Sequence, residues 1–159
     1  MGTRARLKTT LEQAGVVHLD ASVFALHATG HPRYVDLTRV VFGGLRAGEF
    51  EAQTSAVTLF QLLAEPYRRG REERALRAEA CVTALPNLRI LPVSPAIARQ
   101  AAGVRAQLGG SVERALQLAT ALASEAEVFL TQRSTLRRVA GMRVDSLDAY
   151  VGPSSEPLS

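Results

Sequence analysis

Asp20 and Arg133 follow two short apolar runs of the sequence. The first run covers residues 16–19 and ends at Asp20, and a second, 128–131, leads into Gln132 and Arg133. Such runs predict buried parallel strands, and functional side chains gather at the carboxyl ends of parallel strands. The sequence has no His/Cys pair at metal-ligand spacing, no glycine-rich phosphate loop and no Ser/His/Asp arrangement. A carboxylate and arginines therefore remain as the groups for a site.

The charge of the chain permits, but does not by itself indicate, binding to phosphate. The formal net charge is +4, and Lys8 is the only lysine among 19 basic residues. Positive charge attracts nucleic acid, yet aromatic residues make up only 5% of the chain, which leaves few platforms for base stacking. The tight basic groups 68–71 and 137–138 fit either a solvated face or phosphate contact.

Helical and strand patterns alternate along the chain. This alternation predicts an α/β fold with a mainly parallel central sheet of about five strands, flanked by helices. Strands are expected at 16–19, 50–55, 88–93, 128–131 and 142–147. Helices are expected at 21–29, 33–47, from 58 to the Pro66–Gly70 stretch, and at 71–85, 95–108, 111–123 and 134–139.

The sequence predicts one domain with two short ends. Residues 1–15 are expected to be an arm or short helix, residues 16–151 the domain, and the Pro- and Ser-rich tail 152–159 disordered.

Cys81 is the only cysteine, so it forms no internal disulfide, and its helical position predicts a buried side chain. His18 is expected to be a core or edge histidine and not a metal ligand. No apolar run approaches the length of a membrane span, and we expect a cytoplasmic protein.

Four segments together resemble the PIN-domain family, the fold of the VapC-type toxins of bacterial toxin–antitoxin systems. They occur in the order and spacing of that family and span roughly residues 16–151. The segments are 17–23, 54–63, 114–121 and 129–133, with a strand-and-helix stretch at 85–98 between the second and third. The resemblance implies an acidic cluster that holds one or two Mg²⁺ or Mn²⁺ ions for hydrolysis of RNA.

Most of the acids that this resemblance implies are missing from the chain. The first family aspartate falls on Asp20 and is present, whereas the family glutamate falls on Gln61. The other two family aspartates fall on Arg114 and Arg133, so two positions carry the opposite charge. Both arginines are expected in the cleft, one of them forming an ion pair with Asp20. No metal ion or other cofactor is then expected.

Three hypotheses follow for the function. The first is a catalytically impaired PIN-like protein that works by binding. The second is an active Mg²⁺- or Mn²⁺-dependent ribonuclease toxin with a displaced site built from Asp20, Glu65 and Glu113. The third is a module that contacts RNA or another anion through Arg114 and Arg133, which requires that neither arginine pairs with Asp20.

The resemblance also bears on partners. VapC-like proteins are commonly dimers, and their antitoxins often place an arginine in the acidic cleft. Because this chain supplies the arginines itself, we rank a homodimer and RNA above an antitoxin-like protein as partners.

Overall fold

The computed structural model of the chain describes residues 2–151, and the predicted disordered tail lies outside these residues. A six-stranded sheet forms the centre, in the order β3-β2-β1-β4-β6-β5. All neighbouring strands are parallel except β5 and β6. The predicted mainly parallel α/β architecture is therefore confirmed. The strands are β1 (Val17–Leu19), β2 (Ala52–Ser55), β3 (Leu88–Leu91), β4 (Val128–Thr131), β5 (Arg138–Val139) and β6 (Met142–Ser146).

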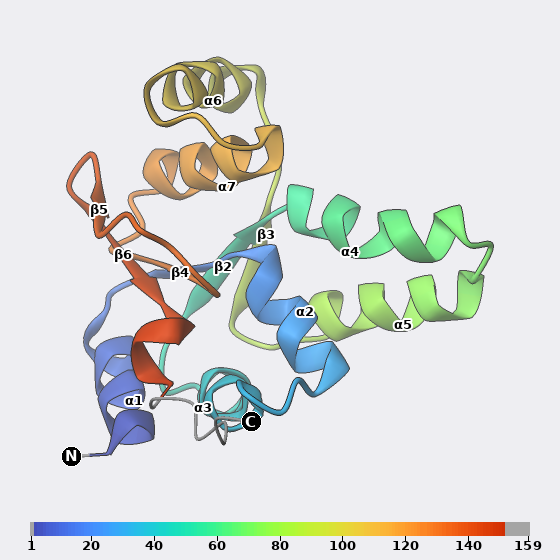
Figure 1. Cartoon of the computed structure of the whole chain (residues 1–159), viewed down its shortest axis with the longest axis vertical. Helices are drawn as coiled ribbons and strands as arrows, with labels where there is room; N and C mark the ends of the chain where they lie inside the picture. The colour runs from blue at the N-terminus through green and yellow to red at the C-terminus, as the bar shows by residue number, and fades with distance from the viewer. Residues whose placement is uncertain (1, 152–159) are drawn as a thin grey trace, which may run out of the picture.

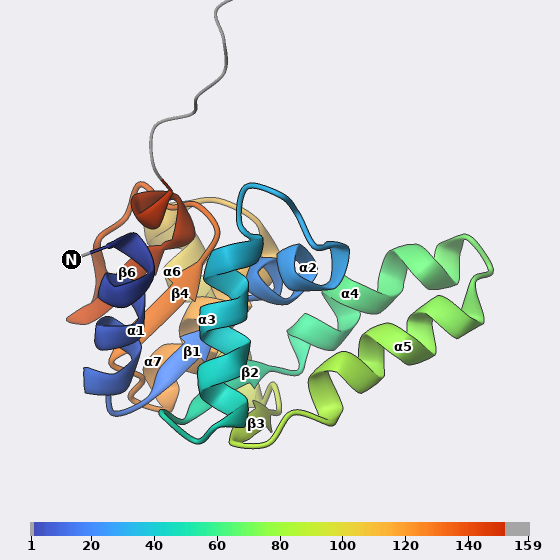
Figure 2. The same cartoon turned by 90° about the horizontal axis from the view of Figure 1, so that it is seen from below.

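Helices cover both faces of the sheet, and one helical pair extends away from it. Figure 1 shows α6 and α7 on one side and α1 and α3 on the other, while α4 and α5 run side by side away from the sheet in Figure 2. The helices are α1 (Thr3–Gln13), α2 (Ala21–Thr29), α3 (Val35–Arg46), α4 (Val57–Arg68), α5 (Glu72–Thr83), α6 (Pro95–Leu108), α7 (Val112–Ala123) and the short 3-10 helix η1 (Leu147–Tyr150).

Two apolar clusters fill the layers on either side of the sheet. Alternate residues of β1 and β4 point to opposite faces, so Leu19 and Leu130 belong to the cluster under α1, α2 and α3. Phe129 belongs to the cluster under α6 and α7. The ring of the fully buried His18 stacks on the Phe129 ring, with 5.2 Å between the ring centroids. The expectation that His18 is a core histidine is confirmed.

Two expectations about secondary structure and burial are wrong. The predicted helix at 134–139 is absent, because Arg138 and Val139 instead form a short antiparallel strand with β6 across the turn at Ala140 and Gly141. Cys81 is exposed, because α5 lies in the outer helical pair and buries only Ala75 and Val82.

No helix within residues 2–151 is both long and apolar enough to cross a membrane.

Candidate functional site

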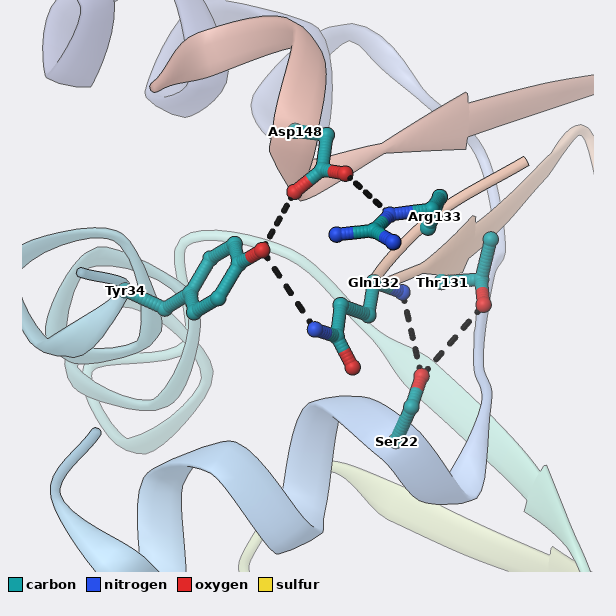
Figure 3. A network of polar contacts seen from close by, with 6 residues as sticks. All are labelled: Ser22, Tyr34, Thr131, Gln132, Arg133 and Asp148. Atoms are coloured by element: carbon teal, nitrogen blue, oxygen red, sulfur yellow. Dashed lines mark hydrogen bonds and ion pairs between the residues drawn. The ribbon is translucent and has the colours of Figure 1, made fainter. Parts of the chain in front are cut away.

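The Asp20 carboxylate lies at the carboxyl ends of two neighbouring strands. Parallel pairing sets Leu19 beside Leu130, so Asp20 lies next to Thr131. The Oδ2 atom of Asp20 accepts hydrogen bonds from the Ser22 hydroxyl at 2.8 Å and from the Thr131 hydroxyl at 2.8 Å. Ser22 Oγ also accepts the backbone N–H of Gln132 at 3.0 Å (Figure 3). The carboxylate is therefore held by two neutral hydroxyl groups.

Arg133 binds a different acid from the one expected. Its Nε donates to Oδ2 of Asp148 at 2.7 Å, and the hydroxyl of the buried Tyr34 donates to the other oxygen of Asp148 (Figure 3). Burial is the largest single effect and raises the pKa of Asp148, but the two hydrogen bonds together with the charges of Arg133 and Arg33 lower it, so the pKa lies below its ordinary value. Pairing of β4 with β6 explains the choice of partner: it sets Thr131 beside Ser146, which places Arg133 next to η1.

Arg114 lies in the first turn of α7 and is also not bound to Asp20. Its Nη2 donates to the Ser134 hydroxyl at 3.0 Å, and its backbone N–H is capped by Ser111 Oγ at 3.1 Å. Arg114 and Arg133 line the same pocket, of about 310 Å³. The expected ion pair between Asp20 and an arginine is thus wrong, because neighbouring hydroxyls bind Asp20 while other groups bind both arginines.

Gln61 is an exposed residue of α4 that joins a chain of buried polar side chains. Its Oε1 accepts from Nε2 of Gln117 at 3.1 Å, and the same Nε2 donates to Thr58 at 2.7 Å. The Gln117 Oε1 lies 2.8 Å from His18 Nε2, and Gln53 Nε2 lies 3.2 Å from His18 Nδ1. The neutral imidazole with its proton on Nε2 satisfies both contacts.

The buried position of His18 favours that neutral form. Burial lowers the pKa of His18 to about 4, against the opposing effects of Gln117 and the Asp20 charge. Sequence reasoning did not identify Gln53 and Gln117, which are both fully buried. A glutamine in the middle of a buried strand, as Gln53 is, was the available signal, since buried polar groups require partners.

The two acids proposed for a displaced site do not join Asp20. Glu65 is bound by Arg68 at 2.7 Å and by Arg69 at 2.6 Å, and the hydrogen bond from Arg68 is the main cause that lowers its pKa to about 2. Glu113 is half-buried next to Arg114 on α7, and it forms no ion pair with another residue in the part of the chain that the structure describes.

Comparison with known proteins identifies the family of this fold. The profile of the PIN domain matches residues 17–142. The chain belongs to the PIN-domain family. Comparison with curated proteins finds no match.

Solved structures share the fold of this PIN domain at low sequence identity. The VapBC2 structure from Rickettsia felis, bound to a DNA fragment from its promoter, has a TM-score of 0.65 at 14% identity, covering 82% of this chain and 98% of that one. DNA-bound VapBC from Salmonella typhimurium has a TM-score of 0.63 at 18% identity, covering 82% and 97%. A toxin–antitoxin complex from Klebsiella pneumoniae has a TM-score of 0.58 at 17% identity, with the same coverage as the Salmonella structure.

The residues at this PIN-domain site do not fit a Mg²⁺ or Mn²⁺ ion. Hard cations require several oxygen ligands, which are commonly carboxylates, and here the Asp20 carboxylate is bound by two hydroxyls, while Gln61, Arg114 and Arg133 occupy the other three positions of the family acids. Within residues 2–151, no group of three His, Cys, Asp or Glu side chains is arranged to hold a metal ion.

Proposed function

We propose that this PIN-domain protein works by binding a partner and does not cleave RNA with a metal ion. The observation that carries the proposal is the pocket between α6, α7 and the segment that follows β4. Arg114 and Arg133 line it, at the two positions where the family resemblance places aspartates. A site of this charge attracts an anion, whereas the family chemistry requires a cluster of negative charge.

The environment of Asp20 supports the same proposal. Its Oδ2 atom accepts hydrogen bonds from two hydroxyls at 2.8 Å each, and a cation would have to compete with both donors for that oxygen. The displaced acidic site has no comparable support, since Arg68 and Arg69 already bind Glu65. An active ribonuclease toxin is therefore the outcome that would contradict the proposal.

A second copy of the chain is the partner that we rank first, together with nucleic acid. The pair α4 and α5 exposes three large apolar side chains, Phe60 (62% exposed), Tyr67 (55%) and Leu76 (63%). Exposed apolar side chains that gather on one part of a protein commonly mark an interface.

The solved VapBC neighbours are complexes with an antitoxin, but an antitoxin arginine has no acidic cluster to enter here, so we rank such a partner third.

Metal-dependent RNase activity is the deciding experiment. We expect no cleavage of a mixed single-stranded RNA by the purified protein with Mg²⁺ or Mn²⁺ above the level seen with EDTA. Asp20→Asn serves as the matched variant, because it removes the one carboxylate retained from the family. Cleavage that needs Mn²⁺, disappears in EDTA and disappears again in Asp20→Asn would establish the ribonuclease instead.

A further inference from the structure

A pocket of mixed character lies between α6, α7 and the segment that follows β4. We call it the α6–α7 pocket, and its volume is about 310 Å³, at the small end of the range for ligand sites. Arg114, Arg133 and Ser134 supply polar groups to its lining. The apolar part of the lining comes from Val104, Leu108, Ala115, Leu118 and Leu136.

One of the two guanidinium groups of the α6–α7 pocket lacks a counter-charge. Asp148 already binds Arg133 at 2.7 Å. Arg114 donates to the neutral Ser134 hydroxyl, and no carboxylate within residues 2–151 lies within 4 Å of its nitrogens. The pocket therefore presents about one uncompensated positive charge, which matches a ligand with a single negative charge.

The position of Arg114 on α7 adds to this preference for an anion. Arg114 is the third residue of a 12-residue helix that Ser111 caps, and the N-terminal end of a helix favours negative charge. Gly109 and Gly110 precede the cap with φ angles of +69° and +83°, and both line the pocket. The Gly110 backbone lies against the Arg114 stem, since a Cβ there would be 3.8 Å from Arg114 Cδ.

The wall of the α6–α7 pocket selects the body of the ligand. Its apolar residues are all aliphatic, and no aromatic side chain lines it. Nucleotide bases bind chiefly by stacking on aromatic rings, so this wall does not favour a base. Leu118 is buried beside the site while Leu108 is 42% exposed at the surface, which gives a branched aliphatic group an apolar path inward from the solvent.

We propose that the α6–α7 pocket binds an aliphatic carboxylate. The planar carboxylate accepts hydrogen bonds from the guanidinium of Arg114, and the aliphatic body packs against Leu108, Leu118 and Leu136. Two sources carry this chemistry, namely a free small acid and the C-terminal residue of a peptide. The inference deepens the proposed function, since it rests on a cleft that binds instead of cleaving.

Titration followed by ¹H–¹⁵N NMR tests the inference with matched pairs of ligands. The acids are 4-methylpentanoate, a free small acid, and N-acetyl-leucine, which represents a peptide C-terminus. Their neutral amides, 4-methylpentanamide and N-acetyl-leucinamide, are the controls. We expect at least one acid to shift the amide signals of residues 108–118 and 134–136, and to bind about tenfold or more tightly than its amide. The acid that binds more tightly identifies the source.

Two substitutions locate the effect in the α6–α7 pocket. Arg114→Gln should remove the preference for acid over amide, whereas Arg99→Gln, at an exposed arginine of α6, should leave it unchanged. Equal binding of each acid and its amide, or an acid preference that survives in Arg114→Gln, would overturn the inference. The RNase assay tests the proposed function separately from the carboxylate site. Metal-dependent cleavage together with intact acid binding would contradict the proposed function and leave the carboxylate site supported.

Discussion

Hydrogen bonds hold the carboxylate of Asp20, the one retained family acid, in position. Its partners come from two places, since Ser22 lies at the start of α2 and Thr131 ends β4. Ser22 also accepts the backbone N–H of Gln132, so the carboxylate indirectly fixes the segment that carries Arg133. At this scale the acid has a structural role that does not require a metal ion.

Removing the Asp20 carboxylate should destabilise the protein. Asp20→Ala leaves the hydroxyls of Ser22 and Thr131 without their acceptor, and we expect the free energy of unfolding to fall by roughly 1–3 kcal/mol in urea denaturation. Asp36→Ala is the control, because Asp36 is exposed and its contact with Arg39 is long, at 3.9 Å; it should change the value by less than about 0.5 kcal/mol. Equal stability of wild type and Asp20→Ala would contradict this role.

At the scale of elements, His18 joins two strands and a helix. It lies on β1, and its ring nitrogens contact Gln53 of β2 and Gln117 of α7. Gln117 continues the connection to Thr58 and Gln61 of α4. The polar chain therefore ties the sheet to the two helices that carry Gln61 and Arg114.

This polar chain predicts a stability that depends on pH. The pKa of His18 falls from its ordinary 6.5 to about 4 in the folded state, so between these values the unfolded state binds more protons and stability rises with pH. Wild type should lose on the order of 3 kcal/mol as the pH falls from 6.5 to 4. His18→Asn should show a shallower dependence in urea denaturation over pH 5–6.5, and parallel curves for the two proteins would refute the assignment.

At the scale of the whole molecule, the site depends on residues that four separate segments bring to one end of the sheet. Reconstruction tests this placement. Gln61→Glu, Arg114→Asp and Arg133→Asp together should create Mg²⁺ binding measurable by calorimetry, because they return carboxylates to the positions of the family resemblance. Gln13→Glu, Arg74→Asp and Arg99→Asp make the same change in net charge at exposed residues and should not bind. Absence of a signal from the first variant would count against the proposed correspondence of positions.

The surface of α4 and α5 gives a second prediction for the whole molecule. If Phe60 and Tyr67 contribute to self-association, the double variant Phe60→Ser/Tyr67→Ser should shift the protein from dimer to monomer in sedimentation velocity. Burial of two large apolar side chains would otherwise stabilise the dimer. Leu108→Ser is the control, as Leu108 is exposed on α6. A dimer that persists in the double variant would place the interface elsewhere.

The elements were largely predictable because their signals are local. Apolar periodicity predicted α6 with its observed bounds and α7 to within one residue. The segment 134–139 misled the prediction because β5 forms only by pairing with β6 across the turn at Ala140 and Gly141. Cys81 was placed inside because a single amphipathic pattern does not show which helices lie in an outer layer.

The sequence by itself determined the family, the order along the chain of all the described strands except β5, and the charge at each of the four site positions. These properties follow from residue identity and spacing along the chain, which can be read without the three-dimensional structure. Only the tertiary structure decided the partners: Thr131 for Asp20, 111 residues away, and Asp148 for Arg133, 15 residues away. A hydrogen bond requires a donor–acceptor distance within a range of a few tenths of an ångström. The strand register and the packing of η1 and α2 decide which donors and acceptors meet that requirement.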